Sequence, residues 1–298
     1  MVPPCFCASA ARLRVLASLG RARWPAVGAT GSPQSGPWLR AVPGLRSAPG
    51  PVSTRIHLCG AISVEVDGAR VERRLPGRQG ALLLAFLVLN RHRPLERDAL
   101  MDALWPAQRP ASAGVAFRAL LSKMRSALGH DALPGRERIQ LVLPPEAWID
   151  IEVADEAIHR AETAVASGEW GEAWGAARVA AMVPERGFLV GHDLPWVDER
   201  RRELERVLER AERCIVACGL SLAGRELVAA ERASRRMVER RPLDESAVIQ
   251  HMQVLAARGD TSAALGAFEG LRLRLRDELG VSPGSDIRAL HLRLLGAD

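Results

Sequence analysis

The chain has 298 residues, 48% of them hydrophobic, which is enough for about two domains of ordinary size. Its five cysteines are an odd number in a long chain and argue against a disulfide framework, and no apolar run approaches the roughly 20 residues that span a bilayer. The formal net charge of +6 is unevenly spread. Residues 1–55 carry seven arginines and no acid, residues 56–149 carry 13 basic and 9 acidic side chains, and residues 150–298 carry 21 and 26. A duplex-binding surface is therefore expected in the middle segment.

The first 55 residues are rich in arginine, proline, glycine and serine and show little sustained periodicity. This composition fits a transit peptide, a degenerate secretion signal or a leader translated from an early start codon. Lys123 is the only lysine among 41 basic residues, which points to a GC-rich coding sequence. We therefore expect a bacterial cytoplasmic protein with a disordered leader over residues 1–55, followed by the folded chain.

The folded chain is expected to begin with a β-hairpin. Residues 62–66 alternate apolar and polar side chains before Asp67-Gly68, a dipeptide that favours a two-residue hairpin turn. Residues 77–90 follow, and because they are apolar almost all round and too long for a strand, they predict a buried helix. Residues 97–105 predict a short second helix, which a proline-rich loop ends.

A third helix is predicted over residues 112–128. Its apolar side chains recur at i, i+3, i+4, i+7 and i+11 and form one core-facing stripe: Phe117, Leu120, Leu121, Met124 and Leu128. Ser112 is expected as its N-cap and Gly129 as its stop. The opposite face presents Gly114, Val115, Arg118, Ser122 and Arg125.

A second β element is predicted after the third helix. Pro134-Gly135 turns the chain, and RIQLVL over residues 138–143 reads as a strand. The expected order is then a strand hairpin, three helices and a closing hairpin. Three helices closed by a hairpin are typical of a winged helix-turn-helix.

Residues 149–298 are expected to be all helical. Gly168, Gly224 and Gly259 each precede an alanine-rich amphipathic segment, and the last two are 35 residues apart, close to the tetratricopeptide period of about 34. A long charged helix is predicted to begin at Pro195-Trp196. In the last helices, an apolar stripe is expected to pack on the preceding helix; the stripe is Ala264, Phe268, Leu271 and Leu275, and its partners are Val248, Met252 and Leu255. Stacked helix pairs form concave surfaces that bind proteins or peptides.

Two groups of motifs resemble a known family. WPAQRPASAGVAFRALLSKMRSALG, residues 105–129, resembles the signature of OmpR-type winged helices in the streptomycete antibiotic regulatory proteins (SARP). The matching positions are Trp105, Pro110, Ala111, Ser112, Ala113, Ser122, Lys123, Met124, Arg125, Leu128 and Gly129. WIDIEVADEA, GHDLPWVDERRRELERV and the stretch from ARGD to DELGVSPGSDIRALH are similar to the bacterial transcriptional activator domain that follows the winged helix in that family. The resemblance covers about residues 56–298.

The resemblance implies a mainly α fold, in which an α+β winged helix over residues 56–148 precedes an all-α tetratricopeptide-like domain over residues 149–298. It also implies a DNA-binding transcriptional regulator and activator. Similar proteins bind direct repeats in promoters as dimers and help to recruit RNA polymerase. The implied partners are therefore double-stranded DNA, RNA polymerase or other transcription machinery and a second protomer, with no membrane partner and no cofactor.

Eight residues are candidates for DNA contact: Arg109, Ser112, Arg118, Ser122, Lys123, Arg125, Arg136 and Arg138. A recognition helix lies in the major groove, where Arg118 could offer two donors to guanine O6 and N7. Lys123 and Arg125, nearer the helix C-terminus, are expected to meet phosphates. Ser112 could combine its cap with a phosphate contact, Arg109 lies in the loop before it, and the remaining two arginines lie on the predicted wing.

The chain also departs from the family pattern. The family often carries polar or basic residues where this helix has Gly114 and Val115, and Ile139 stands near the place of a common wing aromatic. Fewer direct readers imply a base specificity that is narrow or based on DNA shape. The alternative hypothesis is a protein-interaction adaptor whose winged helix has lost DNA binding. A helical domain that binds a small regulatory ligand is a third hypothesis, with only the concave architecture in its favour.

Enzyme and metal functions find little support in the sequence. There is no phosphate-binding G-x-x-x-x-G-K-[ST] loop, no G-x-S-x-G nucleophile elbow and no H-E-x-x-H motif. Cys214 and Cys218 could share a helix face, but no further ligands complete a tetrahedral set, so both are expected as buried thiols. No catalytic, cofactor-binding or metal-binding residue is predicted.

Overall fold

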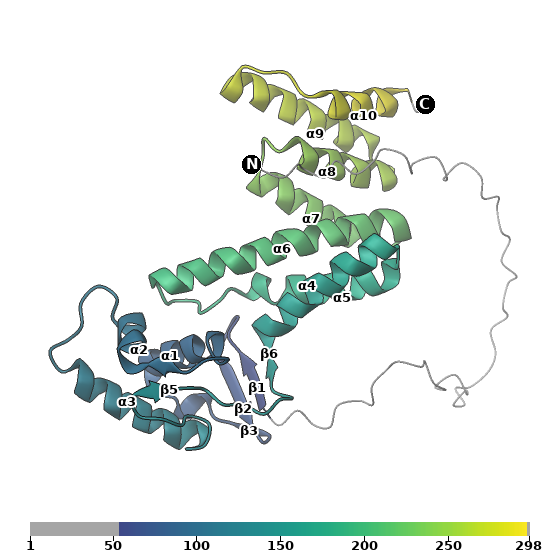
Figure 1. Cartoon of the computed structure of the whole chain (residues 1–298). Helices are drawn as coiled ribbons and strands as arrows, with labels where there is room; N and C mark the ends of the chain where they lie inside the picture. The colour runs from purple at the N-terminus through teal and green to yellow at the C-terminus, as the bar shows by residue number, and fades with distance from the viewer. Residues whose placement is uncertain (1–53, 297–298) are drawn as a thin grey trace, which may run out of the picture. The chain divides into compact units, whose positions relative to one another are not determined.

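Helices make up most of the chain. A computed structural model describes residues 54–296, so the leader predicted over residues 1–55 lies almost entirely outside the described residues. Those residues belong to one unit, Pro49–Asp298. A small sheet and three helices come first, and a run of seven further α-helices follows within residues 54–296 (Figure 1). The mainly α fold class is as the sequence predicts.

Four short strands form the first sheet, in the order β3-β2-β1-β6. β1 (Thr54–His57) pairs antiparallel with β2 (Ser63–Val66), which continues through a tight turn into β3 (Ala69–Arg70). The turn residues Asp67 and Gly68 both have positive φ, 50° and 77°, as a two-residue hairpin turn requires. The predicted hairpin is therefore confirmed.

The predicted end of the leader at residue 55 is wrong by two residues. Thr54 and Arg55 belong to β1, and the Thr54 side chain is buried. β1 gains its stability from two neighbours, since it pairs with β2 on one side and in parallel with β6 (Trp148–Ile149) on the other. A four-residue strand next to a proline-rich stretch shows too little alternation to be predicted from the sequence.

The three predicted helices are present as α1 (Gly77–Leu89), α2 (Arg97–Leu104) and α3 (Ala113–Leu128). All five residues of the predicted α3 stripe are buried, and they join a core that contains residues of α1, α2 and the first sheet. The 3.6-residue periodicity therefore identified the face of α3 that packs, and by elimination the face that is left exposed.

The predicted closing hairpin is wrong. β5 is only Arg138–Ile139 and pairs with β4 (Leu95–Glu96), the strand that precedes α2. The next strand, β6, pairs with β1 instead. The segment between β5 and β6 contains Pro144 and Pro145, which have no N–H to donate to a ladder, so the chain cannot return along β5 as a regular hairpin.

The second half is helical throughout, as predicted. Its elements are α4 (Asp150–Ser167), α5 (Trp170–Met182), the short turn η2 (Pro184–Arg186), α6 (Pro195–Leu222), α7 (Glu226–Arg240), α8 (Glu245–Ala257), α9 (Thr261–Arg274), the π-helical turn η3 (Leu275–Leu279) and α10 (Ser285–Leu295). The stripe expected on the last helices is buried together with its expected partners on α8. The long charged helix begins at Pro195.

Small residues let neighbouring helices of this half pack closely. α4 and α5 bury alanines against each other, among them Ala157, Ala161 and Ala177. A Cβ added at Gly219 of α6 would lie 2.5 Å from the Cβ of Ala230 on α7, so glycine is required for this approach. The alanine-rich composition of the segments is thus explained by helix contacts rather than by solvent exposure.

A buried carboxylate joins the first sheet to the helical half. Asp150, the first residue of α4, is fully buried. Its Oδ2 accepts from Leu58 N and Cys59 N, both at 2.9 Å, and its Oδ1 accepts from Ile151 N at 2.9 Å and Leu58 N at 3.1 Å. Burial raises the pKa of this carboxyl above its ordinary value, and the N–H donors of Cys59 and Leu58 oppose that shift.

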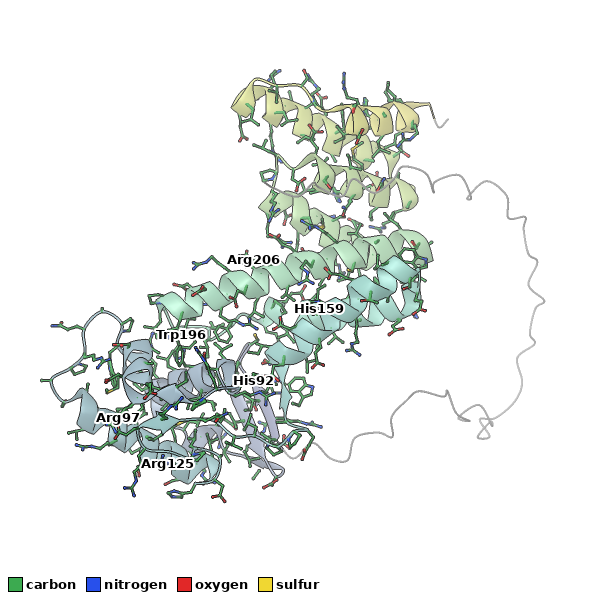
Figure 2. All side chains as sticks on the ribbon, viewed as in Figure 1. His92, Arg97, Arg125, His159, Trp196 and Arg206 are labelled. Atoms are coloured by element: carbon green, nitrogen blue, oxygen red, sulfur yellow. The ribbon has the colours of Figure 1, made fainter. Side chains whose placement is uncertain are left out.

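Apolar side chains continue the same connection. Trp196 at the start of α6 packs edge-on against Phe86 of α1 and Phe188, and its indole Nε1 donates to Ala103 O of α2 at 2.9 Å (Figure 2). Phe188 and Leu204 are buried in the core that also holds the α3 stripe. The three-helix region and the beginning of the helical half therefore share one hydrophobic core.

Replacing Asp150 by Asn tests this connection. In either orientation of the amide, an NH₂ group faces at least one backbone N–H, so a buried donor loses its acceptor. We expect the free energy of unfolding to fall by about 2–3 kcal/mol, measured by urea denaturation of the full chain. The control is Asp131→Asn at an exposed position, where a change within about 0.5 kcal/mol is expected. Equal stability of the two variants would contradict the role given to Asp150.

Candidate nucleic-acid interface

α3 is held by its apolar face and presents the other face to solvent. Phe117 and Met124 are fully buried, whereas Val115 is 60% exposed and Arg118, Ser122 and Lys123 are exposed. A Cβ added at Gly114 would meet nothing within 4 Å, so this glycine is not required by packing. The exposed face is therefore a surface of small, apolar and cationic side chains on a fixed helix.

Arg97 of α2 orients the beginning of α3, and the sequence did not single it out. Its guanidinium lies 5.1 Å from the centroid of the Phe117 ring and donates to Gly114 O at 2.9 Å. A cation over an aromatic face and a charge-assisted hydrogen bond both favour this position. Figure 2 shows Arg97 beside α3. An arginine at a helix start carries no sequence signal for such a contact.

Three candidate cations have no ion pair among residues 54–296. Arg118 and Lys123 lie on the exposed face of α3, and Arg136 lies in the turn before β5. Ser122 is exposed as well, and its carbonyl accepts from Ser126 Oγ. The side chains of these four residues are available for a ligand without breaking an ion pair or hydrogen bond within residues 54–296.

Ser112 takes the N-cap position of α3, but its predicted side-chain cap is absent. Its φ of −92° and ψ of 13° differ from the extended geometry in which a serine oxygen reaches the N–H groups of the first turn. The Ser112 carbonyl instead accepts from Val115 N and Ala116 N, both at 2.9 Å. The hydroxyl is exposed and is not used by the cap.

The other three candidate arginines are paired within the chain. Arg109 fixes the loop before α3 to α2 through Asp102 Oδ1 at 2.6 Å and Asp98 Oδ1 at 3.2 Å. Arg138 pairs with Glu96 at 3.0 Å across the β4–β5 ladder. The third, Arg125, donates from Nε to the Leu133 carbonyl at 2.9 Å and from a terminal nitrogen to the Gly135 carbonyl.

The turn before β5 depends on glycine. Gly135 has φ +90°, and a Cβ there would lie 1.8 Å from the Arg138 carbonyl oxygen, which no side chain tolerates. Arg125 holds this turn against the end of α3, and Arg74 donates to the Ser126 carbonyl from the other side. The short β5 turn therefore takes the place of the predicted wing, with Arg136 exposed on it and Ile139 buried.

The cysteine and histidine side chains of the described residues were candidates for metal or nucleophilic chemistry. No group of three or more His, Cys, Asp or Glu side chains in residues 54–296 could hold a metal ion. Cys214 and Cys218 are buried thiols, as expected, and burial raises the pKa of Cys214 to about 11. Ser234 Oγ lies 2.9 Å from His251 Nδ1, but Ser234 is fully buried and also donates to Glu231 O, which makes this pair a packing contact between α7 and α8. Nor is any helix in that range long and apolar enough to cross a membrane.

Comparison with known proteins identifies the class of protein. Residues 149–295 match the Bacterial transcriptional activator domain family. The chain is 28% identical over 255 residues to the Transcriptional regulatory protein EmbR of Mycobacterium tuberculosis, covering 80% of this chain and 62% of EmbR. It is 29% identical over 265 residues to the Regulatory protein DnrI of Streptomyces peucetius, covering 82% of this chain and 93% of DnrI. These matches make the chain similar to bacterial transcriptional regulators.

Residues 149–295 belong to the Bacterial transcriptional activator domain family, and the chain is similar to SARP-type transcriptional regulators. The relatives carry names of regulatory proteins, not of enzymes. A solved structure titled Mycobacterium tuberculosis EmbR in complex with low affinity phosphopeptide has the same fold, with a TM-score of 0.68 at 24% identity over 83% of this chain and 66% of that one. The chain thus spans 62% of the length of the EmbR sequence, less than two thirds, and it spans 24% of the Regulatory protein AfsR of Streptomyces coelicolor.

Replacing Arg125 by Ala tests whether this arginine is structural. The change removes two charge-assisted hydrogen bonds to carbonyls, so we expect a loss of about 1–2 kcal/mol in the free energy of unfolding. Amide hydrogen exchange at residues 133–138 should become faster. Arg118→Ala on the exposed face is the matched control and should change stability by no more than about 0.5 kcal/mol. If both variants behave alike, Arg125 does not hold the turn.

Proposed function

We propose that this regulator binds double-stranded DNA in promoter repeats through α3 and activates transcription. In this proposal, residues 56–148 are the DNA-binding domain and residues 149–298 contact the transcription machinery or a second protomer, in the cytoplasm of a bacterium. The observation that carries the proposal is the two-sided character of α3. One face is fixed in the core, and the other offers Arg118 and Lys123, which have no ion pair within residues 54–296, at an exposed helix surface.

The geometry supports a division of labour among the eight candidates. Arg118, near the middle of α3, is the base reader, because a free guanidinium can donate twice to guanine in the major groove. Lys123 and Arg136 make phosphate contacts on either side. The paired Arg109, Arg125 and Arg138 fix the loop and the turn that flank α3, and Ser112 and Ser122 offer exposed hydroxyls.

Val115 and Gly114 can also take part in reading DNA, although the family often has polar residues at these positions. The Val115 side chain is 60% exposed at the beginning of α3, where recognition helices meet base edges. Its methyl groups can contact the C5-methyl group of thymine, and Gly114 beside it leaves room for a close approach. The expected site therefore combines a guanine contact with a neighbouring thymine contact.

The test begins with selection of duplexes from a random double-stranded library on the full chain. The enriched duplex and a scrambled duplex are then titrated by fluorescence anisotropy at several salt concentrations. The logarithm of the affinity should fall linearly with the logarithm of the salt concentration, with a slope of about −0.9 for each phosphate contact. No enrichment, or affinity without salt dependence, would instead favour an adaptor whose winged helix has lost DNA binding.

Arg118→Ala is expected to weaken binding to the enriched duplex by about 1–3 kcal/mol and to leave binding to the scrambled duplex nearly unchanged. Arg206→Ala is the charge-matched control, because Arg206 is an exposed arginine on α6 without an ion pair among the described residues (Figure 2). An equal loss in both variants would show that Arg118 contributes only charge and does not read a base.

A further inference from the structure

A groove in the helical half combines an apolar floor with arginine side chains on its rim. It lies between α5 and α7, over α6, and has a cavity volume of about 300 Å³. The buried side chains Ala181 and Ile215 line its floor, and the exposed side chains of Arg178, Met182 and Arg232 line its rim. The small side chain of Ala181 leaves space beside Ile215, and Met182 adds an exposed apolar surface beside the arginines.

The arginines of the groove differ in how they are held. Arg236 is fixed, because its Nε donates to Glu212 Oε1 at 2.6 Å and its side chain also meets Glu185 at 3.1 Å. Glu212 is fully buried and accepts from Arg240 as well, so it supports two arginines.

The other two arginines are open to a ligand. Arg178 lies over the Trp174 ring, 5.6 Å from its centroid, and Arg232 has no ion pair within residues 54–296. With Arg236 already oriented beside them, three guanidiniums line the groove against one carboxylate, that of Glu185.

We infer that this groove binds an acidic, amphipathic peptide segment of a partner protein. An apolar side chain of the peptide enters the space over Ala181 and Ile215, and flanking carboxylates pair with Arg178 and Arg232. Guanidinium groups recognise carboxylates through two parallel hydrogen bonds, and Met182 adapts to apolar side chains of different shape. Grooves of about this size usually combine an apolar lining with a few polar groups that fix orientation.

The distribution of charge along the chain argues against two other occupants of the groove, a long DNA duplex and the chain's own residues 1–55. Residues 150–298 carry 21 basic and 26 acidic side chains, so a long polyanion such as DNA would meet net repulsion from the surface around the groove. A short peptide interacts mainly with the arginines within about 8–10 Å, the distance over which salt screens charges. The chain's own residues 1–55 contain seven arginines and no acid, so they do not complement the groove.

This inference deepens the part of the proposed function that gives the helical half a protein contact. Its test uses no promoter DNA, so failure here leaves DNA binding through α3 untouched. The full chain is used to select from a phage-displayed library of short peptides rich in Asp, Glu, Leu and Phe. The enriched peptide is then synthesised with a fluorophore and titrated by anisotropy, together with a version in which Asn and Gln replace Asp and Glu.

The double variant Arg178→Glu/Arg232→Glu should bind the acidic peptide about tenfold more weakly or worse, and the Asn/Gln peptide should bind neither protein tightly. The matched control is Arg160→Glu/Arg206→Glu, which reverses two exposed arginines that do not line the groove and have no ion pair among the described residues. Its affinity should stay within about twofold of the unmodified chain, because charges outside the contact mostly change encounter rates.

Four results would overturn the inference. The first is that acidic peptides are not enriched, and the second is that both double variants lose the same affinity for the peptide. The third is that a random DNA duplex displaces the peptide and that binding of this duplex requires Arg178 and Arg232. The fourth is a change of molecular mass in sedimentation when these two arginines are reversed, which would assign the groove to a second copy of the chain.

Discussion

The Asp150 carboxylate, bound by backbone N–H groups at the end of β1, is the contact on which the arrangement of the described chain depends. A buried carboxylate is stable only where donors replace the water it has lost, and here the donors come from a segment about 90 residues away in sequence. The position of Asp150 at the start of α4 adds the favourable field of the helix N-terminus. The first strand and the first helix of the second half are consequently fixed to each other, and the core of the three-helix region extends across both.

Arginine serves two roles in this chain, and the structure separates them. Lys123 is the only lysine among 41 basic residues, so nearly every cation is a planar guanidinium with several donors. Where a guanidinium meets carbonyls or carboxylates of its own chain, as Arg97 and Arg125 do, it orients a helix or a turn. Where it has no such partner in the described part of the chain, as at Arg118, the same group is available to a ligand. A count of positive charges therefore overstates the surface available for DNA.

The sequence was sufficient for elements whose pattern is long and local. The α3 stripe repeats over about three turns, and the Asp67-Gly68 turn dictates its own backbone conformation, so both could be predicted from neighbouring residues alone. β4 and β6 could not, because strands of two residues exist only through partners far along the chain, and β1 also depends on the distant β6. The candidate site is likewise predictable from the sequence only in part. The exposed face of α3 follows from periodicity, whereas the pairing of Arg109 and Arg125 depends on the tertiary position of α2 and of the Gly135 turn.

α6 connects the two proposed binding surfaces. Its first turns place Trp196, Val197 and Leu204 in the core that carries α3, and farther along Ile215 lines the groove of the helical half. A switch of α3 by occupancy of the groove would need a second packed state of this helix. The continuous helix therefore favours a role in which the protein recruits a partner to the DNA that it binds. A partner bound at the groove and DNA bound at α3 would be held on one protein, and each would raise the local concentration of the other without any change of shape.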